Sequence, residues 1–566
     1  MRKTLTLLVM SLIATLNLRA ASLPDQQRAQ RARDSNMAST YVPLDSWVYR
    51  AFERLAAEGI VQTAFFSLRP WTRLDCARLI DEAEDQINDQ PVPSDTRELL
   101  RNLKVEFAAE LERRAGYPNR EFRLESLDQR VTVIVGRPLT DGFHFAETLV
   151  DDDGRPFAEG TNLYSGTAFR ATAGPFAAYL NAELQRAPLA PAPNAIADQQ
   201  IAAADFTSTA AAGPASGFLR GRILEAYGAF TFSNNQFTFG RQSLWWGPAR
   251  SGATLFSNNA EPINMIRYDR VRPFELPSFL RYLGPIRAQA MFGRLSGAQF
   301  VHPLNVQYGT SGVALSDQPF IHGEKVAFKP TPNFEFSVSR TTIFGGTGSP
   351  VNFHTYLRSV FSFGTGNGNN DPGDRRQAFD ASYRIPGLRQ CLTGYFDTFA
   401  DDQPFPLVYP TESVWLPGFF LRCVPRLPRL TVRAEGLLSP HRDLAFPGFF
   451  YFNAHYQSGY TNNRQLIGSW IGREAEGEQV WATWNFSPHS LLELSGRNQV
   501  VNREFLQGGS LRDLRATADI ALNPEWQLRV EEQTEWWRFP LLSATPQRNA
   551  AFTIQLSYQP LERTKQ

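Results

Sequence analysis

Long apolar runs are missing from most of this chain. After the run that ends at Leu16, no stretch of the 566 residues approaches the ~20 apolar residues that a membrane-spanning helix requires. A mean hydropathy of −0.32 agrees with that absence. Two classes remain: a protein that is soluble after export, and a membrane protein that crosses the bilayer as a β-barrel.

Histidine and cysteine are scarce as well. The seven histidines show no Ser/His/acid order with a recognisable local signature and no metal-ligand spacing. We therefore expect neither catalysis nor a metal or other cofactor. Of the three cysteines, Cys391 and Cys423 lie on two strand-like runs, and a hairpin of those runs would allow a disulfide in an exported protein. A register error of one residue would separate the pair, so two free thiols are the alternative.

Neither sign of charge is in excess. The chain has 57 basic and 56 acidic residues, which gives no reason to expect nucleic acid as a partner. Only five of the basic residues are lysine, and the rest are arginine. Arginine binds carboxylates bidentately and stacks on aromatic rings, so it suits a polar lumen or an acidic sugar. A genome of high GC content is the alternative explanation.

The first residues predict export. Arg2 and Lys3 precede an apolar run from Leu5 to Leu16, and small residues follow at Ala20 and Ala21. This order is typical of a secretory signal peptide, which we place at residues 1–21.

A helical pattern occupies residues 41–115. Ser46 precedes apolar residues at three- and four-residue spacing, and Gly59 ends that pattern. Thr72 opens a capping-box pattern, and Ser94 could cap a third helix. Short amphipathic helices cannot bury their apolar faces alone, so we expect an N-terminal helical bundle.

From residue 123 to residue 560 the apolar residues alternate with polar ones, which predicts β-strands. In the final strand, Phe552, Ile554, Leu556 and Tyr558 face one way and polar residues face the other. At ~24 residues per strand the region holds about 18 antiparallel strands, with 16 as the alternative. The 43 Phe, 17 Tyr and 11 Trp fit the aromatic girdles of a barrel. The predicted fold class is an all-β transmembrane barrel with an N-terminal helical bundle.

The strand that begins at Phe237 opens into a loop rich in Trp and Asn, and a second aromatic cluster lies at residues 451–464. Trp offers a flat apolar face and Asn offers donors and an acceptor on a short arm, so these segments suit a polar, ring-shaped ligand. The alternative is a tight turn or a membrane girdle with packed Trp. The candidate sugar-binding residues are Arg241, Trp245, Trp246, Asn258, Asn259, Arg267, Tyr456, Tyr460 and Arg464.

Several segments together resemble the capsule assembly protein Wzi family of bacterial outer membranes. They are VPLDSWVYRAFERLAAEGI, RPWTRLDCARLI, GRQSLWWGPARSGATLFSNN, HGEKVAFKPTPNFEFSVSRTTIFGG and LIGSWIGREAEG. The resemblance implies a barrel of about 18 strands, a helical bundle at its periplasmic mouth, and lectin-like attachment of capsular polysaccharide. The chain departs from the family in its long Ala- and Pro-rich segment, residues 187–217, which we expect to be a surface loop.

We therefore expect a monomeric protein of the bacterial outer membrane, surrounded by outer-membrane lipid, that attaches or organises capsular or other surface polysaccharide. The alternative function is a passive porin for sugars or anions. A helical bundle at the barrel mouth would block diffusion, whereas a porin needs an open lumen, so conduction discriminates the two.

Overall fold

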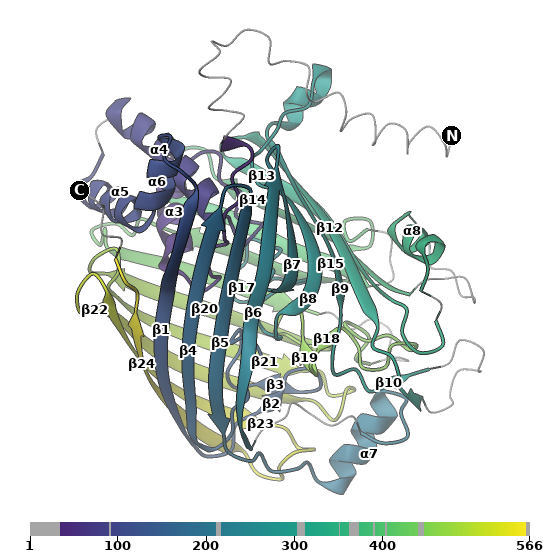
Figure 1. Cartoon of the computed structure of the whole chain (residues 1–566). Coiled ribbons are helices and arrows are strands. Elements are labelled where there is room, and N and C mark those ends of the chain that lie inside the picture. The colour runs from purple at the N-terminus through teal and green to yellow at the C-terminus, as the bar shows by residue number, and fades with distance from the viewer. Residues whose placement is uncertain are drawn as a thin grey trace.

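A closed β-barrel dominates the computed structural model, which describes residues 34–89, 92–210, 217–302, 312–349, 351–361, 373–388, 391–401, 405–439 and 447–561 (Figure 1). The predicted signal peptide lies outside these residues. Eighteen strands form one sheet. β1 pairs antiparallel with both β4 and β24, and β9 pairs with β12, so the sheet closes on itself. The predicted number of strands is confirmed, and the alternative of 16 is wrong.

The barrel strands follow one another around the wall in chain order, each antiparallel to its neighbours. They are β1 (Arg120–Val135), β4 (Gly160–Ala173), β5 (Phe176–Ala187), β6 (Phe218–Phe232), β7 (Asn235–Gln242), β8 (Ile263–Arg270), β9 (Ile286–Arg294), β12 (Phe320–Thr331), β13 (Phe334–Phe344), β14 (Asp374–Arg384), β15 (Leu392–Asp401), β16 (Ser413–Leu421), β17 (Leu430–Leu438), β20 (Ala475–Asn485), β21 (Leu491–Val501), β22 (Gly509–Ala521), β23 (Trp526–Arg538) and β24 (Gln547–Tyr558).

The two ends of the barrel differ. At one end, which we call the turn end, several hairpins turn within a few residues, as at 174–175, 233–234 and 332–333. The connections at the other end, the loop end, are mostly long. They carry the short strand pairs β2 (Thr140–Asp141) with β3 (Ala146–Glu147), β10 (Phe300–Val301) with β11 (Val313–Ala314), and β18 (Thr461–Asn462) with β19 (Gln465–Leu466), and the helices α7 (Ala195–Ala204) and α8 (Phe353–Phe361).

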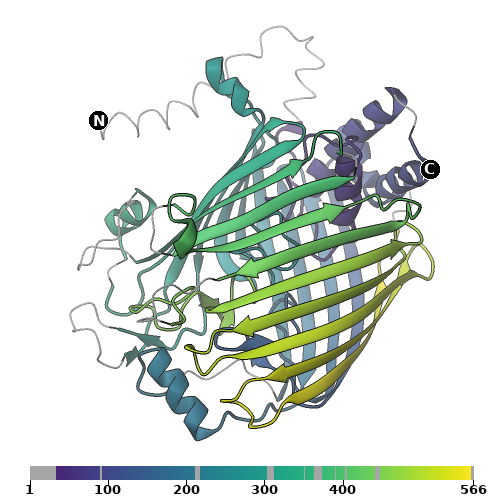
Figure 2. The ribbon, with the colours of Figure 1, turned by 180° about the vertical axis from the view of Figure 1, so that it is seen from behind.

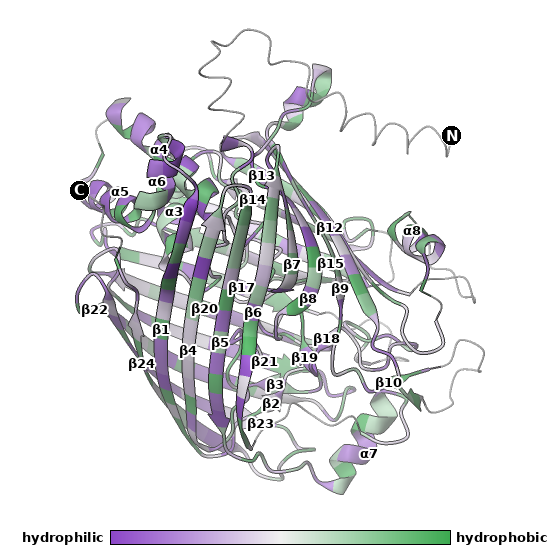
Figure 3. Cartoon of the chain, viewed as in Figure 1, coloured by the Kyte–Doolittle hydropathy of each residue, from purple (hydrophilic) through white to green (hydrophobic). Residues whose placement is uncertain are grey.

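The barrel wall is apolar outside and polar inside. Hydrophobic and hydrophilic residues accordingly recur along the strands of Figure 3. On β24, Phe552 and Ile554 are exposed on the outer face, whereas Thr553 and Ser557 are buried on the inner face. The predicted alternation of the final strand is thus confirmed. Exposed Leu, Ile, Val and Phe recur around the ring, as at Leu219 on β6. An outer surface of this kind suits the hydrocarbon of a bilayer.

Four helices lie at the turn end: α3 (Trp47–Ala57), α4 (Arg73–Asp89), α5 (Ser94–Glu106) and α6 (Ala108–Arg114) (Figure 1). The hydroxyl of Ser46 accepts from the backbone N–H of Val48 and caps α3, as the sequence predicts. Ser94 does not cap α5; it is the first helical residue, after Pro93. The helices share one apolar cluster that includes Phe52, Trp71 and Leu103. Among the described residues, no helix is long and apolar enough to cross a membrane.

Contacts join these helices to the barrel rim. The Trp47 ring lies 4.1 Å from the ring of His489, in the turn between β20 and β21. Glu58 pairs with Arg422, which directly follows β16. A disulfide joins Cys391 to Cys423 at the same end, with their Cα atoms 4.9 Å apart. An aromatic contact and an ion pair therefore bind the helical segment to the turn end of the wall, and the disulfide joins two turns of the wall itself.

Candidate functional site

The loop between β7 and β8, residues 243–262, carries the Trp pair into the barrel. The side chain of Trp246 is only 1% exposed, and its Nε1–H donates to Oε1 of Gln289 over 2.8 Å. Its ring meets Phe256 edge-on, with centroids 5.0 Å apart. An added Cβ at Gly323 would lie 3.0 Å from the same ring, so only a glycine on β12 lets the indole pack this closely.

This loop crosses the lumen. The backbone N–H groups of Arg250 and Ser251 donate to Glu435 on β17, over 2.8 and 2.9 Å. β17 is eight strands from β7 in one direction around the ring and ten in the other, so the loop reaches the opposite wall. On the way, the N–H of Thr254 donates to Asp397 on β15 over 2.8 Å.

The segment before α4 meets this loop inside the barrel. Trp245 and Arg69 exchange two backbone hydrogen bonds of 3.0 Å, and the Arg69 guanidinium lies 5.1 Å from the centroid of the Trp245 ring. On the wall, Glu335 of β13 accepts from the N–H groups of Phe66 and Ser67. A segment that enters the barrel from the turn end is therefore hydrogen-bonded, inside the lumen, to a loop that enters from the loop end.

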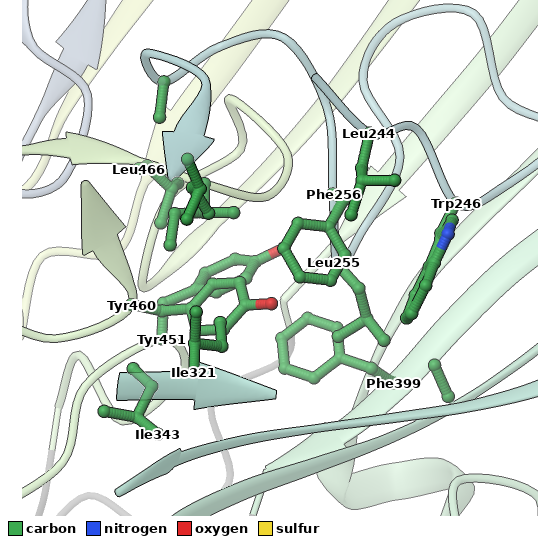
Figure 4. Close-up of a cluster of buried hydrophobic side chains, with 14 of the residues drawn as sticks. Leu244, Trp246, Leu255, Phe256, Ile321, Ile343, Phe399, Tyr451, Tyr460 and Leu466 are labelled. Carbon is green, nitrogen blue, oxygen red and sulfur yellow. The ribbon is translucent and has the colours of Figure 1, made fainter. Parts of the chain in front are cut away.

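The second aromatic cluster of the sequence lies in the loop between β17 and β20 and is buried as well (Figure 4). The hydroxyl of Tyr451 donates to the carbonyl of Thr254 over 2.7 Å. The guanidinium carbon of Arg376 lies 4.5 Å from the centroid of the Tyr460 ring. The hydroxyl of Tyr456 donates to the carbonyl of Gly345. Tyr451 thus joins this loop to the loop that crosses the lumen, and Tyr456 joins it to the connection between β13 and β14.

Arg267 also lies inside the wall rather than at a surface. It pairs with Asp269 over 2.9 Å, and its guanidinium lies 4.1 Å from the centroid of the Tyr41 ring. Both charged side chains are fully buried. The contact of Arg267 with Tyr41 packs β8 against the chain that leads to α3.

Four arginines gather around two glutamates near the loop end, and we call this group the arginine rim. Arg220, Arg222 and Arg241 all pair with Glu261, the first two over 2.9 and 2.6 Å. Glu183 accepts from Arg155 over 2.6 Å and from Arg222 over 3.1 Å. The side chains of Arg220 and Arg241 remain 37% and 22% exposed, so they can reach a ligand.

Asn258 and Asn259 hold residues 151–154, in the connection between β1 and β4, against the arginine rim. The backbone N–H groups of Asp153 and Gly154 donate to the carbonyls of Asn258 and Asn259 over 2.7 and 3.1 Å. The side-chain amide of Asn258 donates to the carbonyl of Asp151 over 2.9 Å. The two asparagines act through short backbone contacts that fix residues 151–154.

Charge around the rim is positive at neutral pH. Burial raises the pKa of Asp151 and of Asp153 to about 8. Burial also opposes ionisation of Asp152, but Arg130 and Arg155 hold the pKa of that carboxyl well below its usual range. Five guanidinium groups, those of the rim and of Arg130, therefore face four acidic side chains, which belong to Asp152, Asp153, Glu183 and Glu261.

A histidine clamp ties together three loops of the loop end. The two ring nitrogens of His144 lie 2.8 Å from Asp141 and 2.8 Å from Asp205, the residue that ends α7. Arg473 reaches the other oxygen of Asp205 over 2.6 Å. Burial alone would lower the pKa of His144, but the two carboxylates outweigh it and raise the pKa to about 10. The imidazolium therefore donates from both nitrogens at neutral pH.

The predicted site residues separate into two groups. Arg241, Asn258 and Arg464 are partly exposed near the loop end, and Asn463, next to Arg464, donates to Glu261 over 2.6 Å. The other predicted residues are buried; they are Trp245, Trp246, Asn259, Arg267, Tyr456 and Tyr460.

Sequence reasoning missed Arg155, Arg220 and Arg222, which lie far from the Trp loop in the chain. For Arg220 and Arg222 the signal was the alternation of Arg with apolar residues at the start of β6, where Leu219 and Ile223 face outward. Within the described ranges, no group of three or more His, Cys, Asp or Glu side chains could hold a metal ion.

Comparisons with known proteins agree with this architecture. A family model for the capsule assembly protein Wzi matches residues 129–552. An uncharacterised 55.8 kDa protein in the cps region of Klebsiella pneumoniae is 25% identical over 197 residues, which cover 34% of this chain and 35% of that protein. The match thus spans about a third of the length of that curated relative.

Solved structures give the fold. One is described as Wzi, an outer membrane protein involved in group 1 capsule assembly in Escherichia coli and a carbohydrate-binding β-barrel. It matches with a TM-score of 0.62 at 15% identity, over 91% of this chain and 99% of that one. OccD3 of Pseudomonas aeruginosa matches with a TM-score of 0.39 at 9% identity, over 78% and 93% of the two chains, and a likeness of that size carries no argument.

The closed ring, the apolar outer face and the loop that crosses the lumen define an outer-membrane β-barrel of 18 strands with a filled interior. Its place is the bacterial outer membrane. The chain belongs to the capsule assembly protein Wzi family, because the family model covers most of its length. The resemblance seen in the sequence is confirmed.

Proposed function

We propose that this protein attaches or organises capsular polysaccharide at the cell surface, as a lectin-like protein without catalysis or a cofactor. Membership of the family supports the link to capsule, and the described carbohydrate binding of the Escherichia coli protein supports the class of ligand. The observation that carries the proposal is the arginine rim, where four arginines surround two glutamates and the side chains of Arg220 and Arg241 are partly exposed.

The chemistry of the rim favours an acidic polysaccharide. Guanidinium groups bind carboxylates bidentately and sugar hydroxyls through single hydrogen bonds. Each such contact is modest, but a repeating chain meets many of them, so the total affinity accumulates. We assign direct contact to Arg220, Arg241, Asn258 and Arg464, and a supporting role to the buried Trp245, Trp246, Asn259, Arg267, Tyr456 and Tyr460.

The two ends of the barrel are assigned to opposite sides of the membrane. We propose that the helices of residues 41–115 form one bundle at the periplasmic mouth, while the barrel of residues 123–560 presents its loop end outside the cell. Short turns on the periplasmic side and longer outer loops are usual for such barrels. We further propose that the protein works as a single barrel in outer-membrane lipid after removal of residues 1–21.

The polysaccharide proposal is tested by replacing both exposed rim arginines with alanine, as R220A/R241A. Loss of two charge-assisted hydrogen bonds should weaken binding of the purified protein to the host's capsular polysaccharide by about tenfold or more. Cells with this variant should release more capsule into the medium. R281A is the matched control, because Arg281 is exposed near the turn end.

Heat-dependent gel mobility shows whether the variant barrel is folded. A folded R220A/R241A barrel with unchanged binding and unchanged capsule retention would rule out the rim as the binding site. Steady single-channel conductance from the intact protein would instead favour the porin alternative, because conduction requires an open lumen.

A further inference from the structure

Helix α8 lies against the outside of the barrel wall (Figures 1 and 2). It belongs to the connection between β13 and β14. The barrel residues that α8 touches have side chains that point outward from the wall, as the alternation along each strand shows. On β13, Arg340 shares its parity with Val338, which is exposed on the outer face, and the inward Ser337 bonds to Asp380.

The helix covers polar groups that would otherwise face outward. The guanidinium of Arg340 donates to the carbonyls of Ser359 and Val360 over 2.7 and 3.0 Å, and so satisfies the last turn of α8. On β12, His322 is fully buried; its Nε2 lies 2.7 Å from Oγ of Ser359 and its Nδ1 lies 3.0 Å from Glu324. α8 is thus held by specific hydrogen bonds to the outer wall.

Aromatic packing sets the rotation of the helix about its axis. Tyr356 points at the wall, where its ring centroid lies 5.4 Å from that of Phe292 on β9 and 6.2 Å from that of Phe344 on β13. Tyr356 and Ser359 are three residues apart and so occupy one face of the helix. That face is the one turned towards the barrel.

Away from the wall, the helix exposes large apolar side chains near both of its ends. Phe353 is 76% exposed and Phe361 is 60% exposed, and Leu357 lies between them on the same stripe, at four-residue spacing. His354 and Arg358 are exposed beside this stripe. An amphipathic helix with large apolar side chains on one side and basic groups at its edge is typical of the membrane interface.

We propose that α8 is an interfacial helix that inserts Phe353, Leu357 and Phe361 into the outer leaflet of the outer membrane. The stripe formed by Phe353, Leu357 and Phe361 continues the lipid-facing surface of the barrel. Val338, two residues before Arg340 on β13, belongs to that surface because its side chain faces outward. Arg358 then reaches the anionic groups of the lipid surface. The helix fixes the depth of the barrel and shields the outward polar groups of β12 and β13 from hydrocarbon.

Spin labels on the full-length protein, reconstituted in bilayers of lipopolysaccharide and phospholipid, test this proposal. Single cysteines are introduced as F353C on α8, V338C as the lipid-facing reference and I196C as the water-facing reference, since Ile196 on α7 is 64% exposed. The native thiols do not interfere, because Cys76 is buried and Cys391 is bonded to Cys423.

The label at F353C should resemble that at V338C: accessible to oxygen, and about fivefold less accessible to a water-soluble nickel chelate than the label at I196C. Equal chelate access at F353C and I196C would overturn the proposal. Protection from both reagents would also overturn it, in favour of a protein contact such as a second copy of the chain. Heat-dependent gel mobility confirms that each labelled barrel is folded.

Discussion

Trp246→Ala is expected to undock the loop that crosses the lumen without opening the wall. The substitution removes a fully buried indole, its contact with Phe256 and its hydrogen bond to Gln289. Truncation of a buried Trp costs about 3–5 kcal/mol. Because Trp246 belongs to the loop and not to a strand, this cost falls on docking of the loop. The undocked population should therefore rise by about two to four orders of magnitude.

Single-channel recording in planar bilayers measures the consequence. The intact protein should be silent, and W246A should show transient conducting events while its heat-dependent gel mobility stays that of a folded barrel. W536A is the matched control, because Trp536 is exposed on β23 and does not contact the loop. Silence of a folded W246A barrel, together with unchanged protease resistance of residues 243–262, would show that other contacts hold the loop and would refute the reasoning.

Other predictions concern the histidine clamp and the disulfide. H144A should make residues 188–210 more sensitive to protease by about tenfold, because Asp141 and Asp205 lose their shared cation; H354A, an exposed histidine on α8, should not. The clamp also predicts a pH dependence. Since the folded pKa of about 10 exceeds an unfolded value near ~6.5, its contribution is complete below pH ~6.5 and is lost as the pH rises through about 10. Hydrogen exchange of α7, corrected for intrinsic rates, should accelerate over that range, and a flat profile would contradict it. Finally, C391S/C423S should lower the thermal unfolding midpoint, because a disulfide across a separation of 32 residues contributes up to about 3–4 kcal/mol in the chain-entropy model. An unchanged midpoint would mean that the β15–β16 ladder already closes that segment.

Local patterns in the sequence were enough to predict the barrel and the first helices. The alternation around Phe552 and Ile554 and the cap at Ser46 depend on neighbours a few residues away, and both are present in the structure. The segment 187–217, expected to be a surface loop, connects β5 to β6 at the loop end and contains helix α7, which was not predicted from the sequence. Asn194 caps that helix by accepting from the N–H of Ala197, and alanine is the best helix former, so its composition had a second interpretation.

The site could not be predicted in the same way, because it is formed by contacts between residues far apart in the chain. Trp246 has the composition of a sugar platform, yet it is buried because the chain carries its loop inward to Gln289, some forty residues away. The arginine rim joins Arg155, Arg222 and Glu261, which the pairing of the consecutive strands β4 to β8 brings together. A strand pattern shows which side chains face the lumen, but it does not show which loops enter the lumen to meet them.

We infer that packing in the filled lumen favours arginine over lysine. A barrel wall that faces water can use any polar residue, but a wall that faces packed loops must satisfy each buried charge with directed hydrogen bonds. Arg376 illustrates this: it is fully buried, binds Asp374 over 2.6 Å and Asp401 over 3.0 Å, and covers the ring of Tyr460. A lysine at that position could make the ion pairs only as a point charge and would lose the planar stacking. R376K should therefore loosen the loop between β17 and β20, measured as faster proteolysis of residues 447–474, although it keeps the charge. The same substitution at the exposed Arg512 on β22 should have no such effect, and if both variants behave alike, the arginines reflect codon bias rather than packing.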